Sequence, residues 1–131
     1  MRPCWIEVEH NLLAHNLEQI WKHTGPRKLM AVVKANAYGH GIIETATLYQ
    51  KLGVDWLAVA IAQEGIELRK AGISIPILVF GGVLQDQIQE FLDWDLEFTV
   101  SSLENLDWTE KTVQPIGKRA RVHLKIDTGM E

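Results

Sequence analysis

Residues 29–41 join an apolar run to a lysine and a polar loop, and read Leu29-Met30-Ala31-Val32-Val33-Lys34-Ala35-Asn36-Ala37-Tyr38-Gly39-His40-Gly41. The first five residues are apolar and include two valines, which indicates a short buried strand. Residues 42–52 follow as a helical stretch that ends at Gly53, a residue type common just past helix ends. This part of the chain therefore predicts a strand, a loop and a helix, with Lys34 where the strand ends.

The same unit recurs along the rest of the chain. Further apolar strands are expected at residues 56–61, 76–80, 96–100 and 120–126, with amphipathic helical stretches between them. One of these helices begins at Ser101-Ser102-Leu103-Glu104, which we interpret as a capping box. Upstream of the first unit, residues 4–9 alternate like a half-buried strand, and residues 11–23 carry a helical apolar stripe.

Apolar strands that alternate with amphipathic helices are typical of parallel βα units. Two α/β architectures are open, a doubly wound sheet and a (β/α)8 TIM-type barrel. No G-x-G-x-x-G loop follows the first strand, which argues against a dinucleotide-binding sheet. A complete barrel needs about 250 residues and eight strands. We therefore expect residues 1–131 to be the N-terminal portion of a barrel, truncated after its fifth βα-type strand.

The composition argues against several classes of partner. The net charge is −4 and the sequence has no basic run, so we expect no nucleic-acid binding. The longest apolar runs, such as residues 73–82, are too short to cross a bilayer, and the N-terminus does not resemble a signal peptide. With Cys4 as the single cysteine, these features predict a cytoplasmic protein. The five histidines lack a convincing metal-ligand spacing, so no metal is expected.

Lys34 is the strongest candidate for chemistry. Active sites of barrels are built where the strands end, and a neutral lysine amine placed there attacks an aldehyde to form an imine. Position alone favours a plainer interpretation, in which the side-chain stem packs and the ammonium reaches water. The residues that follow Lys34 decide between the two.

The string from Lys34 to Gly41 resembles the cofactor-lysine motif of the alanine racemases, which place Lys-Ala-Asn-Ala-Tyr-Gly-His-Gly after the first barrel strand. The resemblance implies that Lys34 holds pyridoxal 5'-phosphate as a Schiff base. It also implies that Tyr38 donates a hydrogen bond to the cofactor phosphate and that Val32 lines the pocket. We interpret Asn36 and His40 as residues that shape the loop.

The rest of the chain shows weaker similarity to the same family. Residues 2–8 resemble its opening strand, which in the family joins a C-terminal β domain that we expect to lie outside residues 1–131. Residues 59–73 resemble the family's second strand and helix, and residues 75–81 resemble its third strand. Alone, these segments match any barrel core.

A second motif lies near the C-terminus, where residues 123–130 resemble the family's strand that ends in Lys-x-Asp-Thr-Gly-Met. Strand alternation places His123, Lys125 and Asp127 on one face, with apolar residues between them on the other. Charged residues on an inward face need partners or a function. In the family this lysine positions an arginine that contacts substrate and cofactor, so we expect Lys125 and Asp127 to help orient the substrate.

The resemblance implies an isomerase that interconverts L- and D-alanine for peptidoglycan and the cell wall, and that acts as a homodimer. In the family the cofactor lysine is the base on one face of the substrate, and a tyrosine of the partner subunit's C-terminal domain is the base on the other. We therefore expect the 131 residues alone to be inactive. Two alternatives stay open, a pyridoxal-phosphate-binding homeostasis module of the same barrel type and a catalytically dead fragment. A basic amino-acid decarboxylase of this fold has a different lysine motif.

Overall fold

The computed structural model describes residues 4–129 and contains all five strands predicted after residue 28. The elements follow in the order α1 (His10–Thr24), β1 (Met30–Val32), α2 (Lys34–Tyr38), α3 (Ile42–Leu52), β2 (Trp56–Val59), α4 (Ala62–Lys70), β3 (Ile77–Val79), η1 (Gln85–Gln87), α5 (Ile88–Asp93), β4 (Glu97–Val100), α6 (Leu103–Val113), η2 (Gln114–Ile116) and β5 (Val122–Leu124). Every helix within this part of the chain is too short or too polar to span a bilayer.

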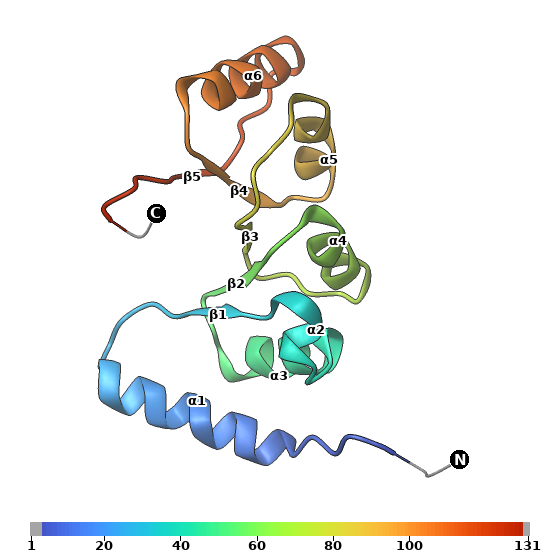
Figure 1. Ribbon diagram of the computed structural model, residues 1–131, viewed down its shortest axis with the longest axis vertical. Helices are drawn as coiled ribbons and strands as arrows, with labels where there is room; N and C mark the ends of the chain where they lie inside the picture. Colours follow the sequence, from blue (N-terminus) through green and yellow to red (C-terminus); the bar gives the residue numbers. More distant parts are fainter. Residues whose placement is uncertain (1–3, 130–131) are drawn as a thin grey trace.

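The order of the strands decides between the two predicted architectures. The strands pair as β1-β2-β3-β4-β5, and each neighbouring pair is parallel. Nearly all connections between parallel strands are right-handed. When each new strand is added on the same side of the sheet, every connecting helix therefore lies on the same face. Figure 1 shows α2 to α6 on one side of the strands. A doubly wound sheet reverses its strand order and is covered on both faces, so this fold is an arc of a (β/α)8-type barrel.

The strand register aligns apolar residues on the face that the helices cover. Val59, Val79 and Phe98 lie side by side on β2, β3 and β4. All three belong to one buried core together with Ile66 of α4 and Phe91 of α5. The rings of Phe91 and Phe98 are 5.0 Å apart between centroids. Burial of each such side chain stabilises the fold by about 1.5–3 kcal/mol, so this row fixes how the helices seat on the sheet.

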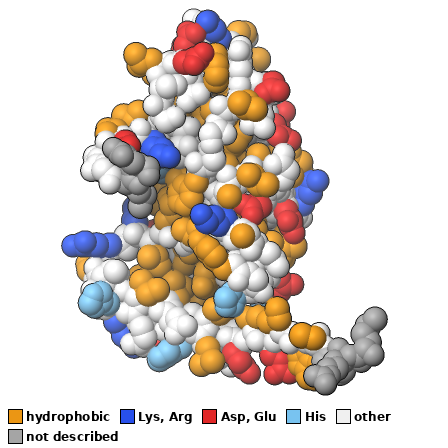
Figure 2. All heavy atoms as spheres, in the orientation of Figure 1, with side chains coloured by type: hydrophobic (Ala, Val, Ile, Leu, Met, Phe, Trp, Pro, Cys, Tyr) orange, Lys and Arg blue, Asp and Glu red, His pale blue; other side chains and the backbone are white. Residues whose placement is uncertain are grey.

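The opposite face carries a polar cluster. The Glu97 side chain is 6% exposed, accepts a hydrogen bond from Trp56 Nε1 (3.0 Å) and pairs with Arg121 Nε (3.1 Å). His123 Nε2 lies 2.8 Å from the same carboxylate. The predicted orientation of His123 is therefore confirmed, since its neighbour Val122 aligns with the core residue Phe98 on the other face. Figure 2 shows hydrophobic side chains gathered over the strands and acidic ones mainly along the helical side.

The N-terminal segment differs from its prediction. Residues 4–9 form no strand and pair with no other part of residues 4–129, and the exposed fractions of Trp5 and Ile6 are 69% and 79%. A strand needs a neighbour to take its backbone hydrogen bonds, and alternation in the sequence does not provide one. Membership of this segment in a separate β domain stays a prediction.

The start of α6 also differs from its prediction. Ser102 is the N-cap residue, and its hydroxyl accepts a hydrogen bond from the Asn105 amide at 3.1 Å. The expected capping box between Ser101 and Glu104 is wrong by one position. Adjacent serines both suit an N-cap, so the pattern alone does not fix which one begins the helix.

Arg69 of α4 connects the helix layer to the segments that lead into two strands. Its guanidinium donates to the carbonyls of Ile73 (2.8 Å), Ile75 (2.8 Å) and Asp95 (2.9 Å), and more weakly to that of Trp94 (3.2 Å). Burial lowers the pKa of the Arg69 guanidinium, and the negative charge of Asp95 opposes this effect. One side chain thus holds α4 against the starts of β3 and β4.

We predict that Arg69→Lys lowers the free energy of unfolding by about 1–3 kcal/mol, because an ammonium cannot replace the planar fork that reaches these carbonyls. Urea denaturation of the purified protein measures this change. The control is Arg119→Lys, an exposed position where we expect a change within about 0.5 kcal/mol. Equal stability of the two variants would contradict the role given to Arg69.

Candidate active site

The ends of β1, β2 and β3 form a rim at which parallel strands stop side by side. The exits of β2 and β3 approach closely, since Gly81 N donates to Ala60 O at 3.0 Å. A Cβ atom at position 81 would lie 2.5 Å from that oxygen, so this contact requires glycine. The Thr99 hydroxyl of β4 donates to Phe80 O at 3.3 Å on the same rim. Barrel active sites are built at this end of the strands.

Lys34 begins α2, a short turn of unusual hand directly after β1. The φ angles of Ala35, Asn36, Ala37 and Tyr38 all lie between 51° and 56°, in the left-handed region. This conformation costs an L-residue roughly 1–2 kcal/mol, and among these four only asparagine adopts it readily. A loop was predicted here, and its left-handed winding does not follow from residue propensities. Strain of this kind persists only where the surroundings fix it.

Hydrogen bonds of the motif residues themselves help to hold the turn in this conformation. The Asn36 side-chain oxygen accepts from Ile42 N at 2.9 Å, and the Asn36 carbonyl accepts from Gly39 N and Gly41 N at 3.0 and 3.1 Å. His40 Nδ1 lies 2.8 Å from the Ala37 carbonyl. Asn36 and His40 therefore shape the loop, as the sequence interpretation proposed, and connect the turn to the start of α3.

Glu64 provides the other hydrogen bonds that hold the turn in place. The sequence analysis did not identify this residue. Its Oε1 accepts from Ala35 N at 2.7 Å, while its Oε2 accepts from Ala60 N at 2.8 Å and from Ile61 N at 3.3 Å. The available signal was its place at the third position of α4, where a glutamate often reaches back to the amides that begin a helix. Nothing in the sequence indicates the contact with the neighbouring βα unit.

Val32 is the last residue of β1, and the turn that follows carries Lys34 and Tyr38. Lys34 is half-buried, Tyr38 is 62% exposed and Val32 is 37% exposed. Among residues 4–129, neither the Lys34 ammonium nor the Tyr38 hydroxyl has a hydrogen-bond or ion-pair partner. A half-buried amine and a hydroxyl that are both available fit a ligand that offers an aldehyde and a phosphate. The residues present are thus compatible with pyridoxal phosphate.

Lys125 and Asp127 lie elsewhere, past the end of β5. The Lys125 amide continues the sheet by donating to Val100 O at 2.9 Å, and the Asp127 side chain accepts from Gly129 N at 2.9 Å. Both side chains are exposed. Three strands, β2 to β4, separate β5 from β1 in the sheet. The role of Lys125 and Asp127 toward the substrate stays a prediction.

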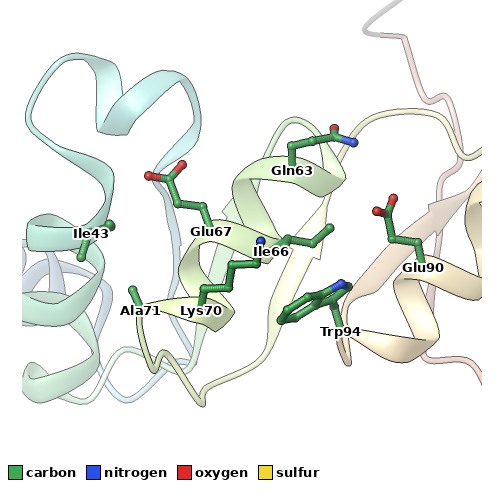
Figure 3. Close-up of a pocket in the computed structure, with 8 residues that line it drawn as sticks. All are labelled: Ile43, Gln63, Ile66, Glu67, Lys70, Ala71, Glu90 and Trp94. Carbon is green, nitrogen blue, oxygen red and sulfur yellow. The ribbon is translucent and has the colours of Figure 1, made fainter.

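A groove of about 630 Å³ lies on the helical side, between α3, α4 and α5 (Figure 3). It is lined by Ile43, Gln63, Ile66, Glu67, Lys70, Ala71, Glu90 and Trp94. The Lys70 ammonium lies 5.5 Å from the Trp94 ring centroid, an arrangement that a surface cation–π pair explains. This groove opens on the outside of the arc and includes none of the predicted site residues.

Comparisons with known proteins identified similar sequences and similar folds. Residues 8–131 match the family model described as alanine racemase, N-terminal domain. An alanine racemase of Methanococcus maripaludis is 43% identical over 129 residues, which are 98% of this chain and 35% of that protein. The solved structure of an alanine racemase from Clostridium difficile 630 superimposes with a TM-score of 0.88 at 40% identity, over 92% of this chain and 32% of that one.

A histidine racemase from Leuconostoc mesenteroides also superimposes, with a TM-score of 0.86 at 29% identity, over 92% of this chain and 32% of that one. The chain spans about a third of the length of these relatives.

Substitution of alanine by glycine distinguishes the left-handed turn from an ordinary right-handed helix. Ala14→Gly in α1 should lower the free energy of unfolding by about 1 kcal/mol, as in any right-handed helix. Ala35→Gly should leave it unchanged or raise it by up to about 1 kcal/mol, because glycine adopts positive φ without strain. Urea denaturation of both variants decides the point, and an equal loss at the two positions would mean that the turn is not left-handed.

Proposed function

The chain belongs to the alanine racemase family, and from this premise we propose that it forms the cofactor-holding part of a pyridoxal-phosphate-dependent racemase that interconverts L- and D-alanine. The observation that carries the proposal is the Lys34 amine, half-buried and without a protein partner among residues 4–129, on a strained turn at the barrel rim. A strained turn that is held by several hydrogen bonds is costly to keep without a function.

Lys34 has two tasks in this proposal. Its amine would hold the cofactor through the aldehyde group, and the same amine would move a proton at the substrate Cα. Bound pyridoxal phosphate supplies an electron sink for the electron pair that the departing proton leaves behind. Racemisation also needs a base on the opposite face, which we assign to a tyrosine of a partner subunit, following the family resemblance.

Tyr38 and Val32 complete the cofactor site in this proposal. The Tyr38 hydroxyl is exposed four residues after Lys34, and a phenol donates a hydrogen bond to a phosphate oxygen. Val32 precedes Lys34 by two residues and presents an apolar surface to the cofactor ring. The Asn36 and Glu64 hydrogen bonds hold the turn that carries Lys34 and Tyr38 directly after Val32, which limits the rearrangement needed when the cofactor binds.

Alanine as the substrate is supported by the names of the relatives and not by a side-chain pocket on this chain. The similarity to a histidine racemase keeps other amino acids in consideration. A pyridoxal-phosphate-binding homeostasis module is the second candidate, and the Lys-Ala-Asn-Ala-Tyr-Gly-His-Gly string from Lys34 to Gly41 and the 43% identity to an alanine racemase argue against it. The homodimer, the cytoplasmic location and the supply of D-alanine for peptidoglycan stay predictions from the sequence.

We expect Lys34→Ala in the full-length racemase to lose at least about a thousandfold in D-alanine formation, because the covalent anchor and one base disappear together. A D-amino-acid oxidase coupled assay with L-alanine measures the rate. Lys51→Ala, an exposed lysine of α3, is the matched control and should keep wild-type activity. Substantial turnover by a folded Lys34→Ala protein would refute the proposed function.

Lys125 receives a separate test. If it orients the substrate, Lys125→Ala should raise KM or lower kcat by about tenfold or more, while the pyridoxal phosphate content stays at the wild-type level. Steady-state kinetics of the full-length variant with L-alanine provide both constants. Unchanged kinetics would show that Lys125 is a solvated charge past the end of β5.

A further inference from the structure

The Glu64 carboxylate joins two consecutive βα units at the rim. One oxygen accepts from Ala35 N at 2.7 Å, on the residue that follows Lys34. The other accepts from Ala60 N at 2.8 Å and Ile61 N at 3.3 Å, at the exit of β2. A single side chain therefore sets the position of the Lys34 turn relative to the neighbouring strand.

This bond satisfies a donor that the turn cannot satisfy by itself. The first amides of a helical turn have no acceptor within it, and β1 has already ended at Val32 when the chain reaches Ala35. Further along the turn the backbone closes on itself, with Ala37 N donating to Val33 O at 2.9 Å. Glu64 thus holds the turn at the end nearest to Lys34, while Asn36 holds it at the end nearest to α3.

The hydrogen bonds that Glu64 accepts explain why the side chain at this position is a carboxylate. Three backbone N–H groups converge on it, and an ionised carboxylate offers two acceptor oxygens and no donor. Glutamine keeps one acceptor oxygen but directs an NH2 group at the other amides. Aspartate keeps both oxygens but is shorter by one methylene, so that it cannot reach Ala35 while it caps α4. Among common side chains, only glutamate meets both requirements of length and charge.

We propose that Glu64 is a positioning residue for Lys34, one that fixes the left-handed turn so that the lysine amine and the Tyr38 hydroxyl meet the same cofactor molecule. The proposal rests on the function proposed above and extends it to a residue outside the lysine motif. Glu64 acts through the Ala35 amide and touches neither the substrate nor the cofactor.

The test compares Glu64→Gln with wild type in the apo form of the full-length racemase. We expect the dissociation constant for pyridoxal phosphate, from a fluorescence titration, to rise at least tenfold. Borohydride trapping of the cofactor on Lys34, followed by mass spectrometry over time, should slow by a similar factor. Glu67→Gln is the matched control, since this exposed carboxylate lies one turn later on α4 in the outer groove. Both quantities should stay within twofold of wild type for Glu67→Gln.

A purely structural role predicts a different pattern. A folded Glu64→Gln protein with a lower melting temperature, but with cofactor affinity and trapping rate within twofold of wild type, overturns the proposal. Hydrogen exchange of the Ala35 amide gives a readout that needs no cofactor: it should be slow in wild type and at least tenfold faster in the variant. Rapid exchange of this amide in the wild-type apoprotein also overturns the proposal.

Failure of the role proposed for Glu64 and failure of the proposed function give different results. If Glu64→Gln does not fold, Glu64→Asp replaces it, with the same expected direction for affinity, trapping and exchange and the same result counting against the proposal. If wild type fails to capture pyridoxal phosphate on Lys34, the proposed function fails. The exchange comparison then still tells whether Glu64 holds the turn.

Discussion

The handedness of the strand crossovers is the constraint on which the rest of this structure depends. Five parallel strands are added in sequence order, and right-handed connections place the helices on one face. The apolar row of Val59, Val79 and Phe98 lies on this face and supplies the surface on which the helices pack. Within residues 4–129, the helices α2 to α6 leave the other face uncovered. The side chains proposed to hold the cofactor lie at the rim, where the chain leaves β1 and reaches Lys34.

The rim has opposite energetic requirements from the core. The core is stabilised by buried apolar area, whereas the turn after β1 costs energy in each of four consecutive residues with positive φ. Hydrogen bonds that involve the side chains of Asn36, His40 and Glu64 offset part of that cost. A turn held from both sides has little freedom to move Lys34 away, which suits an amine that must meet one atom of a ligand. Preorganisation of this kind is commonly found at catalytic sites.

Much of the fold could be predicted from the sequence, because hydrophobic periodicity reports local structure directly. The βα repeat and the inward face of His123 were correct, and the choice between two α/β architectures needed only the strand order. Predictions that depend on partners distant in the sequence were weaker. Residues 4–9 alternate without a strand to pair with, and two adjacent serines obscured the start of α6. Glu64 was missed for the same reason, because its contact with Ala35 spans 29 positions.

We propose that Lys34 is the residue that binds pyridoxal phosphate, and covalent trapping of the cofactor tests this assignment. The protein is loaded with pyridoxal phosphate, reduced with borohydride and digested, and the modified peptide is sequenced by mass spectrometry. We expect a single stoichiometric adduct on Lys34, in the peptide that contains the left-handed turn. An adduct on Lys28, Lys51 or Lys125 in its place, or no adduct at any lysine, would contradict it.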